Sequence, residues 1–298
     1  MLKHFQAWRE RGWQVIDAAA YAEAWQRFGG SVASHPLVLE QLAELADIPV
    51  RYLGWQQAGE LKAAVPTWGR HLALSKDVLK RHGKKGLFDL GNAEIILPAA
   101  CDAAAPLRHA GRYLSALNEG RFSGLKAQPE QLAMARAHED LSKKFRYNQR
   151  RELRLLEEAG GLVRPISDFS AAEIAAMYCD LFQRRWGFPA TGAARMAEVV
   201  ERLRALLIGS VLFLQGAPIA IQLVYRVEAA QWISVEYVNG GVDPETKAFS
   251  PGSVLSFLNT QAAWEDANAR GKALRFSFGR ADREYKDRWC NPVPVFQS

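Results

Sequence analysis

The chemistry that this sequence can support centres on one carboxylate in an otherwise apolar strand. Residues 232–238 are rich in β-branched and aromatic types and predict a strand in which Glu236 shares a face with Ser234. In apolar surroundings a carboxylate can have a raised pKa and take a proton from an amine, so Glu236 is a candidate general base. The structural alternative is an ion pair across the sheet between Glu236 and Arg226 or Arg275.

Basic and aromatic residues form a second candidate group near the C-terminus. Tyr285 and Lys286 follow Arg280 and Arg283, which add positive charge beside them. Lys286 can neutralise a phosphate or a developing negative charge. In the alternative interpretation it forms a surface pair with Asp282, one helical turn earlier.

A third group ends the helix predicted over residues 171–186. Arg184, Arg185 and Trp186 are expected to line the same cleft as the C-terminal group. Basic residues at a helix C-terminus also stabilise the helix dipole, so structure alone explains much of this pattern.

Several other kinds of site are absent from the sequence. It has no Ser-His-Asp pattern, no Walker motif and no Gly-x-Gly-x-x-Gly motif. The last of the six histidines is His138, so a site in the second half has no histidine base. Cys101, Cys179 and Cys290 are widely spaced and form neither a paired metal motif nor a disulfide framework. We therefore expect reduced thiols and no metal.

The elements that position these groups follow a defined order. Strands at 211–215, 219–225 and 232–238 are separated by short turns and predict an antiparallel meander. A helix at 254–270 then leads to a strand at 273–278, and such a crossover makes a parallel strand pair. The loop before this helix directs backbone N–H groups outward, which suits an anionic ligand.

The first half has its own predicted elements. A helix is expected at 36–46, a hairpin from 50–55 and 61–66, and further strands at 84–90 and 93–98. Helical spacing also places the aromatic residues of 21–28 on one packing face. The alternative for this N-terminal region is a membrane-surface segment formed by Trp8, Trp13 and Trp25 beside Lys3, Arg9 and Arg11.

A long helix is predicted over residues 131–159, between the two halves. Its segment from 136 to 154 carries seven basic and three acidic residues beside a thin apolar stripe. This helix is either a solvated connection between two lobes or a surface that faces phosphate or lipid.

Composition limits the class of protein. A chain of 298 residues with 49% hydrophobic and 23% charged residues forms one large or two medium globular domains. The net charge of +6 favours an acidic partner, such as a membrane surface, a nucleotide or a nucleic acid. No stretch has the pattern of a signal peptide or a membrane span. We expect a soluble cytoplasmic protein that at most lies on the inner face of the cytoplasmic membrane.

The order of elements resembles the GNAT acyltransferase core, and the ending resembles its Fem-like branch. Phe276-Ser-Phe-Gly279 is followed by Tyr285-Lys286 and Trp289, and the basic residues 141–160 resemble the helix that Fem-like proteins carry between two halves. As a whole, the chain resembles the macrophage-inducible (Mig) family of Gram-negative bacteria, which is linked to resistance against cationic antimicrobial peptides.

The resemblance implies an α/β (α+β) fold with two tandem GNAT-like lobes and mixed, mainly antiparallel sheets. The lobes are expected at residues 1–130 and 161–298, joined by a basic helix at 131–160. The implied reaction transfers an acyl group from acyl-CoA, such as acetyl-CoA, or an aminoacyl group to an amine. The implied site residues are Glu236, Tyr285 and Lys286 for catalysis, Tyr237, Val238, Ser250, Gly252, Ser253 and Arg280 for the donor, and Arg184 and Trp186 for the substrate.

One departure from the superfamily pattern leaves the identity of the donor undetermined. Acyl-CoA-dependent members of the superfamily carry a glycine-rich turn before the crossover helix, whereas this chain has Phe249-Ser-Pro-Gly-Ser253. Pro251 has no N–H group to offer to a pyrophosphate. The rival function is a non-catalytic resistance factor that binds anionic lipid through residues 143–154. Binding of tRNA by the same basic surface is a third interpretation.

Overall fold

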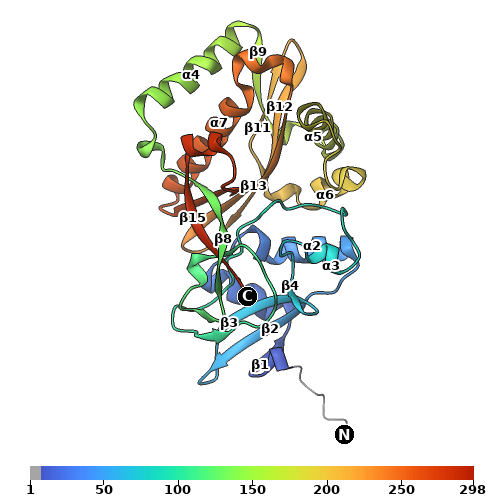
Figure 1. The fold of residues 1–298 in the computed structure, drawn as a ribbon, viewed down its shortest axis with the longest axis vertical. Helices are drawn as coiled ribbons and strands as arrows, with labels where there is room; N and C mark the ends of the chain where they lie inside the picture. The colour runs from blue at the N-terminus through green and yellow to red at the C-terminus, as the bar shows by residue number, and fades with distance from the viewer. Residues whose placement is uncertain (1–7) are drawn as a thin grey trace.

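The computed structural model describes residues 8–298, and its largest element is a nine-stranded sheet (Figure 1). The strands of this sheet are β6 (Leu114–Ser115), β8 (Lys126–Ala135), β9 (Gly161–Pro165), β10 (Leu207–Ile208), β11 (Ser210–Leu214), β12 (Ala217–Glu228), β13 (Trp232–Val242), β14 (Ala273–Arg280) and β15 (Cys290–Gln297). They follow the order β6-β15-β8-β14-β13-β12-β11-β9, and β10 pairs with β12.

The centre of this sheet has the predicted order. β11, β12 and β13 form an antiparallel meander, and helix α7 (Pro251–Ala269) crosses to β14, which pairs with β13 in parallel. The α/β fold with mixed, mainly antiparallel sheets is therefore confirmed.

Helices cover both faces of the sheet (Figure 1). α5 (Ala171–Trp186) and α6 (Met196–Arg202) cover one face, and α7 and α4 (Lys143–Glu158) cover the other. Alternation along β13 follows this division, since Val238 packs in the core that contains Leu181, whereas Tyr237 packs in the core that contains Phe257. Adjacent side chains of β13 thus pack on opposite faces of the sheet.

A smaller sheet in the N-terminal half has four antiparallel strands, β1 (Trp13–Ile16), β2 (Arg51–Gln57), β3 (Glu60–Trp68) and β4 (His71–Leu72). The helices beside it are α1 (Ala18–Phe28), α2 (Pro36–Ala46) and α3 (Val78–Arg81), and β5 (Ala105–Pro106) pairs with β7 (Phe122–Ser123). Short 3-10 helices complete the chain at Trp8–Glu10, Val32–Ser34, Ala116–Asn118, His138–Asp140, Ile166–Asp168, Ala193–Arg195, Arg204–Leu206, Pro244–Phe249 and Glu284–Arg288.

The N-terminal aromatic residues pack inside the protein. Tyr21 and Trp25 of α1 are fully buried, and Trp13 is 2% exposed, so the packing interpretation is correct for these residues. Trp8 is exposed. Lys3, which the membrane-surface alternative included, lies outside the described residues. None of the helices within residues 8–298 combines the length and apolar character needed to cross a bilayer.

The helix predicted over residues 131–159 is wrong in its first part. Residues up to Ala135 belong to β8, and the helix begins at Lys143, where the Ser142 hydroxyl accepts a hydrogen bond from the Phe145 N–H group. β8 pairs with β14 and β15, and this tertiary pairing overrides the helical preference of its Gln, Leu and Met residues. The predicted lobe boundary at residue 130 falls within this strand.

The predicted strands at 84–90 and 93–98 are also wrong. This segment forms turns with one isolated bridge, between Ile95 and Leu114, and several of its backbone N–H groups donate to side chains. The Ile96 N–H group donates to Ser31 Oγ at 3.0 Å, and the Glu94 N–H group donates to Glu236 Oε2 at 3.1 Å. The segment therefore packs against the middle of β13, at Glu236 and Val238.

At the C-terminus, the predicted helix at 282–289 is a 3-10 helix at Glu284–Arg288, and β15 follows it. The sequence did not predict β15.

Candidate functional site

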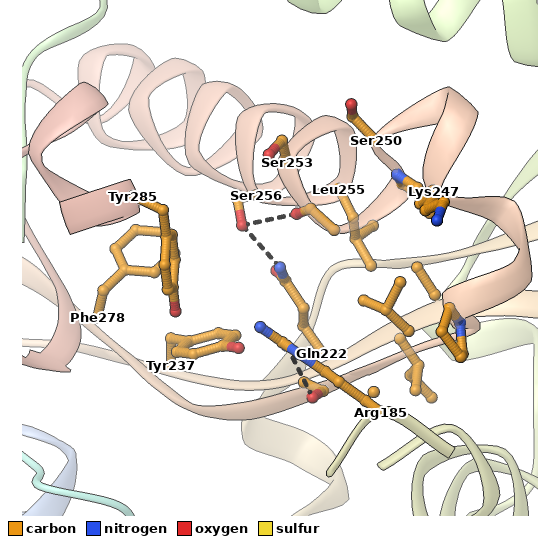
Figure 2. A pocket seen from close by; sticks show the side chains of 18 of the residues that line it. Arg185, Gln222, Tyr237, Lys247, Ser250, Ser253, Leu255, Ser256, Phe278 and Tyr285 are labelled. Atoms are coloured by element: carbon orange, nitrogen blue, oxygen red, sulfur yellow. Dashed lines mark hydrogen bonds between the residues drawn. The ribbon is translucent and has the colours of Figure 1, made fainter. Parts of the chain in front are cut away.

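The candidate site lies where two parallel strands separate. Glu236 of β13 and Ser277 of β14 are the last residues that pair across these strands. A cavity of about 320 Å³ lies on the α7 side of this separation (Figure 2). Its lining includes Arg185, Gln222, Tyr237, Gly240, Lys247, Ser250, Gly252, Ser253, Ser256, Phe278, Tyr285 and Trp289. We call this the donor cavity.

A β-bulge shapes the floor of the donor cavity. Leu223 of β12 pairs with Asn239, and Val224 pairs with Tyr237, so Val238 has no partner across the strands. A bulge of this kind changes the direction of neighbouring side chains and is common beside active sites. Here Tyr237 lines the donor cavity, whereas Val238 packs on the other face.

One end of the donor cavity carries hydroxyl groups and a lysine. Lys247 and Ser250 lie at this end, with Ser253 beside them on the first turn of α7 (Figure 2). The N–H groups of Ser253 and Val254 already donate to the Ser250 carbonyl, at 2.9 Å and 3.1 Å. Pro251 has no N–H group, so the helix N-terminus offers few free backbone donors. An anion at this end depends mainly on side chains, above all on Lys247.

The other end of the donor cavity carries two tyrosines. Burial, with a smaller contribution from the Tyr285 hydroxyl, raises the pKa of Tyr237 to about 12, although Arg185 opposes the shift. Burial also raises the pKa of Tyr285, and Arg185 again opposes it. Both phenols are therefore protonated at neutral pH and can donate a hydrogen bond or a proton.

Arg185 occupies the middle of the donor cavity, between its two ends (Figure 2). It extends from the last turn of α5 and donates to the Gly240 carbonyl of β13 at 3.1 Å. The same guanidinium lies 4.6 Å from the centre of the Trp186 ring. These contacts fix a positive charge against the wall of the cavity.

A buried polar network supports the wall of the donor cavity. Gln222 donates to Ser256 Oγ at 2.8 Å and accepts from Asn259 Nδ2 at 2.9 Å, which joins β12 to α7. Ser256 in turn donates to the Gly252 carbonyl at 2.9 Å. These residues were not predicted from the sequence. The available signal was a glutamine within the apolar run at 219–225, because a buried amide in a strand needs partners.

The structure brings only some of the predicted site residues to the donor cavity. Those that line it are Tyr285, Tyr237, Ser250, Gly252 and Ser253. Glu236, Lys286, Val238, Arg280, Arg184 and Trp186 have other surroundings.

Glu236 is buried on the face opposite α7. It is 2% exposed, accepts from Ser277 Oγ at 2.9 Å and accepts from the Glu94 N–H group at 3.1 Å. Burial raises its pKa well above the usual range. The predicted ion pair is wrong, because Arg275 pairs with Glu94 and Arg226 pairs with Asp266.

Lys286 holds the end of β14. Its ammonium group donates to the carbonyl oxygens of Phe278 and Arg280, at 2.8 Å and 2.7 Å, and lies 3.8 Å from Asp282. Burial lowers the pKa of this lysine. These contacts occupy its donors within the protein and agree with the structural alternative.

The arginines that flank the site form local ion pairs. Arg184 pairs with Asp180 at 3.1 Å and with Asp243 at 2.7 Å, and Arg280 pairs with Asp282 at 2.7 Å. Trp186 and Val238 line a different cavity on the α5 side of the sheet.

Residues 35–298 match the family model described as Mig-14. The chain belongs to the Mig-14 family. A comparison with curated protein sequences gives no significant match. Within residues 8–298, the structure places no group of three or more His, Cys, Asp or Glu side chains where they can hold a metal ion.

Solved structures share the fold of this Mig-14 family member. The crystal structure of FemX matches with a TM-score of 0.60 and 10% identity, covering 96% of both chains. The C-terminal domain of a putative lysylphosphatidylglycerol synthetase from Agrobacterium fabrum matches with a TM-score of 0.54 and 13% identity, over 94% of this chain and 92% of that one. The Fem-like fold predicted from the sequence is confirmed by these two structures.

Proposed function

We propose that this Mig-14 family member is an acyltransferase that moves an acyl or aminoacyl group from an activated donor to an amine. The observation that supports this proposal is the donor cavity at the separation of β13 and β14. Lys247 and Ser250 at one end suit the anionic part of a donor, and the protonated Tyr237 and Tyr285 lie at the other end. The two Fem-like structures share this fold.

The proposed reaction needs no covalent enzyme intermediate. The amine nitrogen attacks the donor's carbonyl carbon, a C–N bond forms, and the C–S or C–O bond to the leaving group breaks. The attacking nitrogen loses a proton to solvent, and the phenol of Tyr285 or Tyr237 protonates the departing sulfur or oxygen. Arg185 stabilises negative charge that develops near these hydroxyls. Glu236 and Lys286 act in this proposal by holding β13 and β14 in place.

The nature of the donor is the first property to test. A donor that binds only the folded protein raises its melting temperature. Thermal-shift titrations compare acetyl-CoA, free CoA, a longer acyl-CoA and an aminoacyl-tRNA. We expect at least one of them to give a saturable shift, and Lys247→Met is expected to weaken that donor by roughly tenfold because one charge-assisted contact is lost.

The matched control for Lys247→Met is Lys126→Met, which changes an exposed lysine of β8 outside the donor cavity. If the donor raises the melting temperature of both variants equally, Lys247 does not contribute to donor binding. Absence of a shift with every donor contradicts the acyltransferase proposal.

A second candidate function, binding to an anionic membrane surface, has one observation in its favour. α4 exposes Lys143, Lys144 and Arg150, and it packs beside β9, where Leu162 is 59% exposed. Exposed apolar groups beside basic ones suit a lipid surface. Co-sedimentation with anionic vesicles tests it. Absence of binding at low salt, where the attraction is strongest, contradicts it.

A further inference from the structure

A second cavity lies on the face of β13 that is opposite to the donor cavity. Its volume is about 280 Å³, and Val238 and Asn239 of β13 form part of its wall. α5 supplies most of the rest of the wall, and the loop that contains Asp89 covers it from the N-terminal half. The two cavities therefore meet the same bulged segment of β13 from opposite sides.

Aromatic side chains dominate this second cavity. Tyr178, Phe182 and Trp186 project from α5, and Phe188 follows the helix. The rings of Phe182 and Phe188 make an edge contact at 5.7 Å, and Phe188 remains 56% exposed. Aromatic faces in this arrangement attract an ammonium group and also accommodate an apolar stem.

The charged side chains on this wall, within residues 8–298, are Asp89 and Arg283. Asp89 uses Oδ1 to accept from the Gly91 N–H group at 2.9 Å, and Lys76 lies 3.5 Å from the same oxygen. Within residues 8–298, no group donates a hydrogen bond to Asp89 Oδ2, and the side chain of Asp89, which forms an ion pair with Lys76, is 35% exposed. Arg283 forms no ion pair in that part of the chain. One carboxylate oxygen and one guanidinium group thus remain available to a ligand.

Tyr178 places the second cavity close to the reacting end of the donor cavity. Burial, followed by the proximity of Tyr237 and Asp89, raises the pKa of Tyr178. Tyr178 therefore lies close enough to Tyr237 of the donor cavity and to Asp89 for both groups to influence it. Both cavities thus contact the segment of β13 around Tyr237 and Val238.

We propose that this second cavity is the acceptor site and that it binds a zwitterion, a molecule with a primary amine, an acidic group and an apolar or aromatic stem. The inference rests on the proposed function and names the acceptor class for it. Asp89 and the aromatic rings hold the ammonium group, and Arg283 holds the carboxylate or phosphate. A purely cationic amine fits less well, because the unpaired Arg283 repels it.

Binding to the intact chain tests this proposal without a donor. The probes are L-phenylalanine, 2-phenylethylamine, which lacks the acid, 3-phenylpropionate, which lacks the amine, and O-phosphoethanolamine, which carries a phosphate. Affinities are measured by ligand-observed NMR titration. We expect L-phenylalanine or O-phosphoethanolamine to bind about tenfold more tightly than either single-charge analogue, since each lost charge-assisted contact costs roughly that factor.

Two variants test which residue binds the ammonium group of the zwitterion and which binds its acidic group. Asp89→Asn keeps the acceptor for the Gly91 N–H group and is expected to weaken the zwitterion by about tenfold while 3-phenylpropionate is unaffected. Arg283→Gln is expected to weaken the zwitterion and 3-phenylpropionate, but not 2-phenylethylamine. Arg288→Gln, an exposed arginine of the same 3-10 helix, is the matched control.

Equal affinity for all four probes, or zwitterion binding that neither variant changes, overturns the assignment. Failure of the proposed function gives a different result. In that case no donor shifts the melting temperature and no transfer occurs, while the zwitterion still binds in a manner that depends on Asp89 and Arg283.

Discussion

Glu236→Gln replaces a buried carboxyl group whose ionisation the fold disfavours. Burial raises the pKa of Glu236 well above the usual range, and the hydrogen bonds from Ser277 and the Glu94 N–H group only partly oppose this shift. In the unfolded chain the same group has a pKa of about 4.3. Above that pH, the folded protein therefore keeps a proton that the unfolded chain releases.

The sign and size of the effect follow from this difference. Between the two pKa values the folded state binds one more proton than the unfolded state, so the free energy of unfolding falls as the pH rises, by about 1.4 kcal/mol per pH unit. The stability that the raised pKa provides is complete below the unfolded pKa and is lost toward the folded pKa. The glutamine of the variant does not titrate. The stability of the native protein minus that of the variant is thus expected to fall as the pH rises above the unfolded pKa, with a slope of at most about 1.4 kcal/mol per pH unit.

The assay is urea denaturation followed by tryptophan fluorescence, at pH 5, 6 and 7, for both proteins. Taking the difference cancels the titration of distant carboxylates. Glu201→Gln is the control, because Glu201 is exposed on α6, and its difference is expected to be constant over the same range.

A Glu236→Gln difference that is constant with pH, or that rises with pH, refutes this reasoning. It means that the Glu236 carboxyl is ionised in the folded protein, and the general-base role predicted from the sequence then regains support. The expected outcome instead assigns Glu236 to folding, and transfer activity is expected to persist in the variant.

Two further predictions concern the surroundings of the site. Lys286→Met removes the hydrogen bonds from the ammonium group to the Phe278 and Arg280 carbonyls, of which the first is buried, and is expected to lower the free energy of unfolding by about 1–3 kcal/mol. Lys144→Met is expected to be neutral. Urea denaturation measures both, and equal effects contradict the structural role. Gly91→Ala places a Cβ 3.0 Å from the Val238 carbonyl at a φ of +69°, and Gly86→Ala has similar backbone strain at +83° with open space around it. Gly91→Ala is expected to lower the free energy of unfolding more than Gly86→Ala in the same assay. Equal decreases for the two variants refute the contact between Gly91 and β13.

The central meander and its crossover could be predicted because their signals are local. Strand-forming runs, short turns and a helix of sufficient length specify β11 to β14 and α7 without knowledge of distant residues. The parallel pairing of β13 with β14 then follows from the connection alone.

β8 and β15 could not be predicted in the same way. β8 has helix-forming composition, and β15 contains Pro292 and Pro294, which disfavour an interior strand. Both prolines lie opposite β8, in a part of β15 where β6 does not pair on the other side, so the missing N–H groups disrupt no ladder there. The pairing that creates these strands joins residues far apart in the chain, and a local pattern carries no signal for it.

The same difference between local and long-range signals explains which site residues could be predicted. The sequence located the turn at Ser250 and the Tyr285 side chain, since both belong to a recognisable motif. It did not identify the contributions of Lys247 and Gln222, and it assigned Tyr237 and Val238 to one ligand although they face different cavities. Alternation along a strand predicts only that adjacent side chains point to opposite faces of the sheet. It does not predict which cavity each of them lines. The cavities themselves arise from α5, α7 and the loop around Asp89, which meet β13 only in the folded chain.

The bulge at Val238 gives the proposed reaction its geometry. In the proposed reaction, the acceptor amine must reach the carbonyl carbon of the donor. The backbone ladder of a continuous parallel sheet blocks such an approach from the opposite face. Here the ladder between β13 and β14 ends at Glu236 and Ser277, directly before the bulge, and a cavity lies on each side. The buried hydrogen bonds of Glu236 and Lys286 fix the strand ends at this opening. In the proposed reaction, these hydrogen bonds contribute by holding β13 and β14 in fixed positions beside the two cavities.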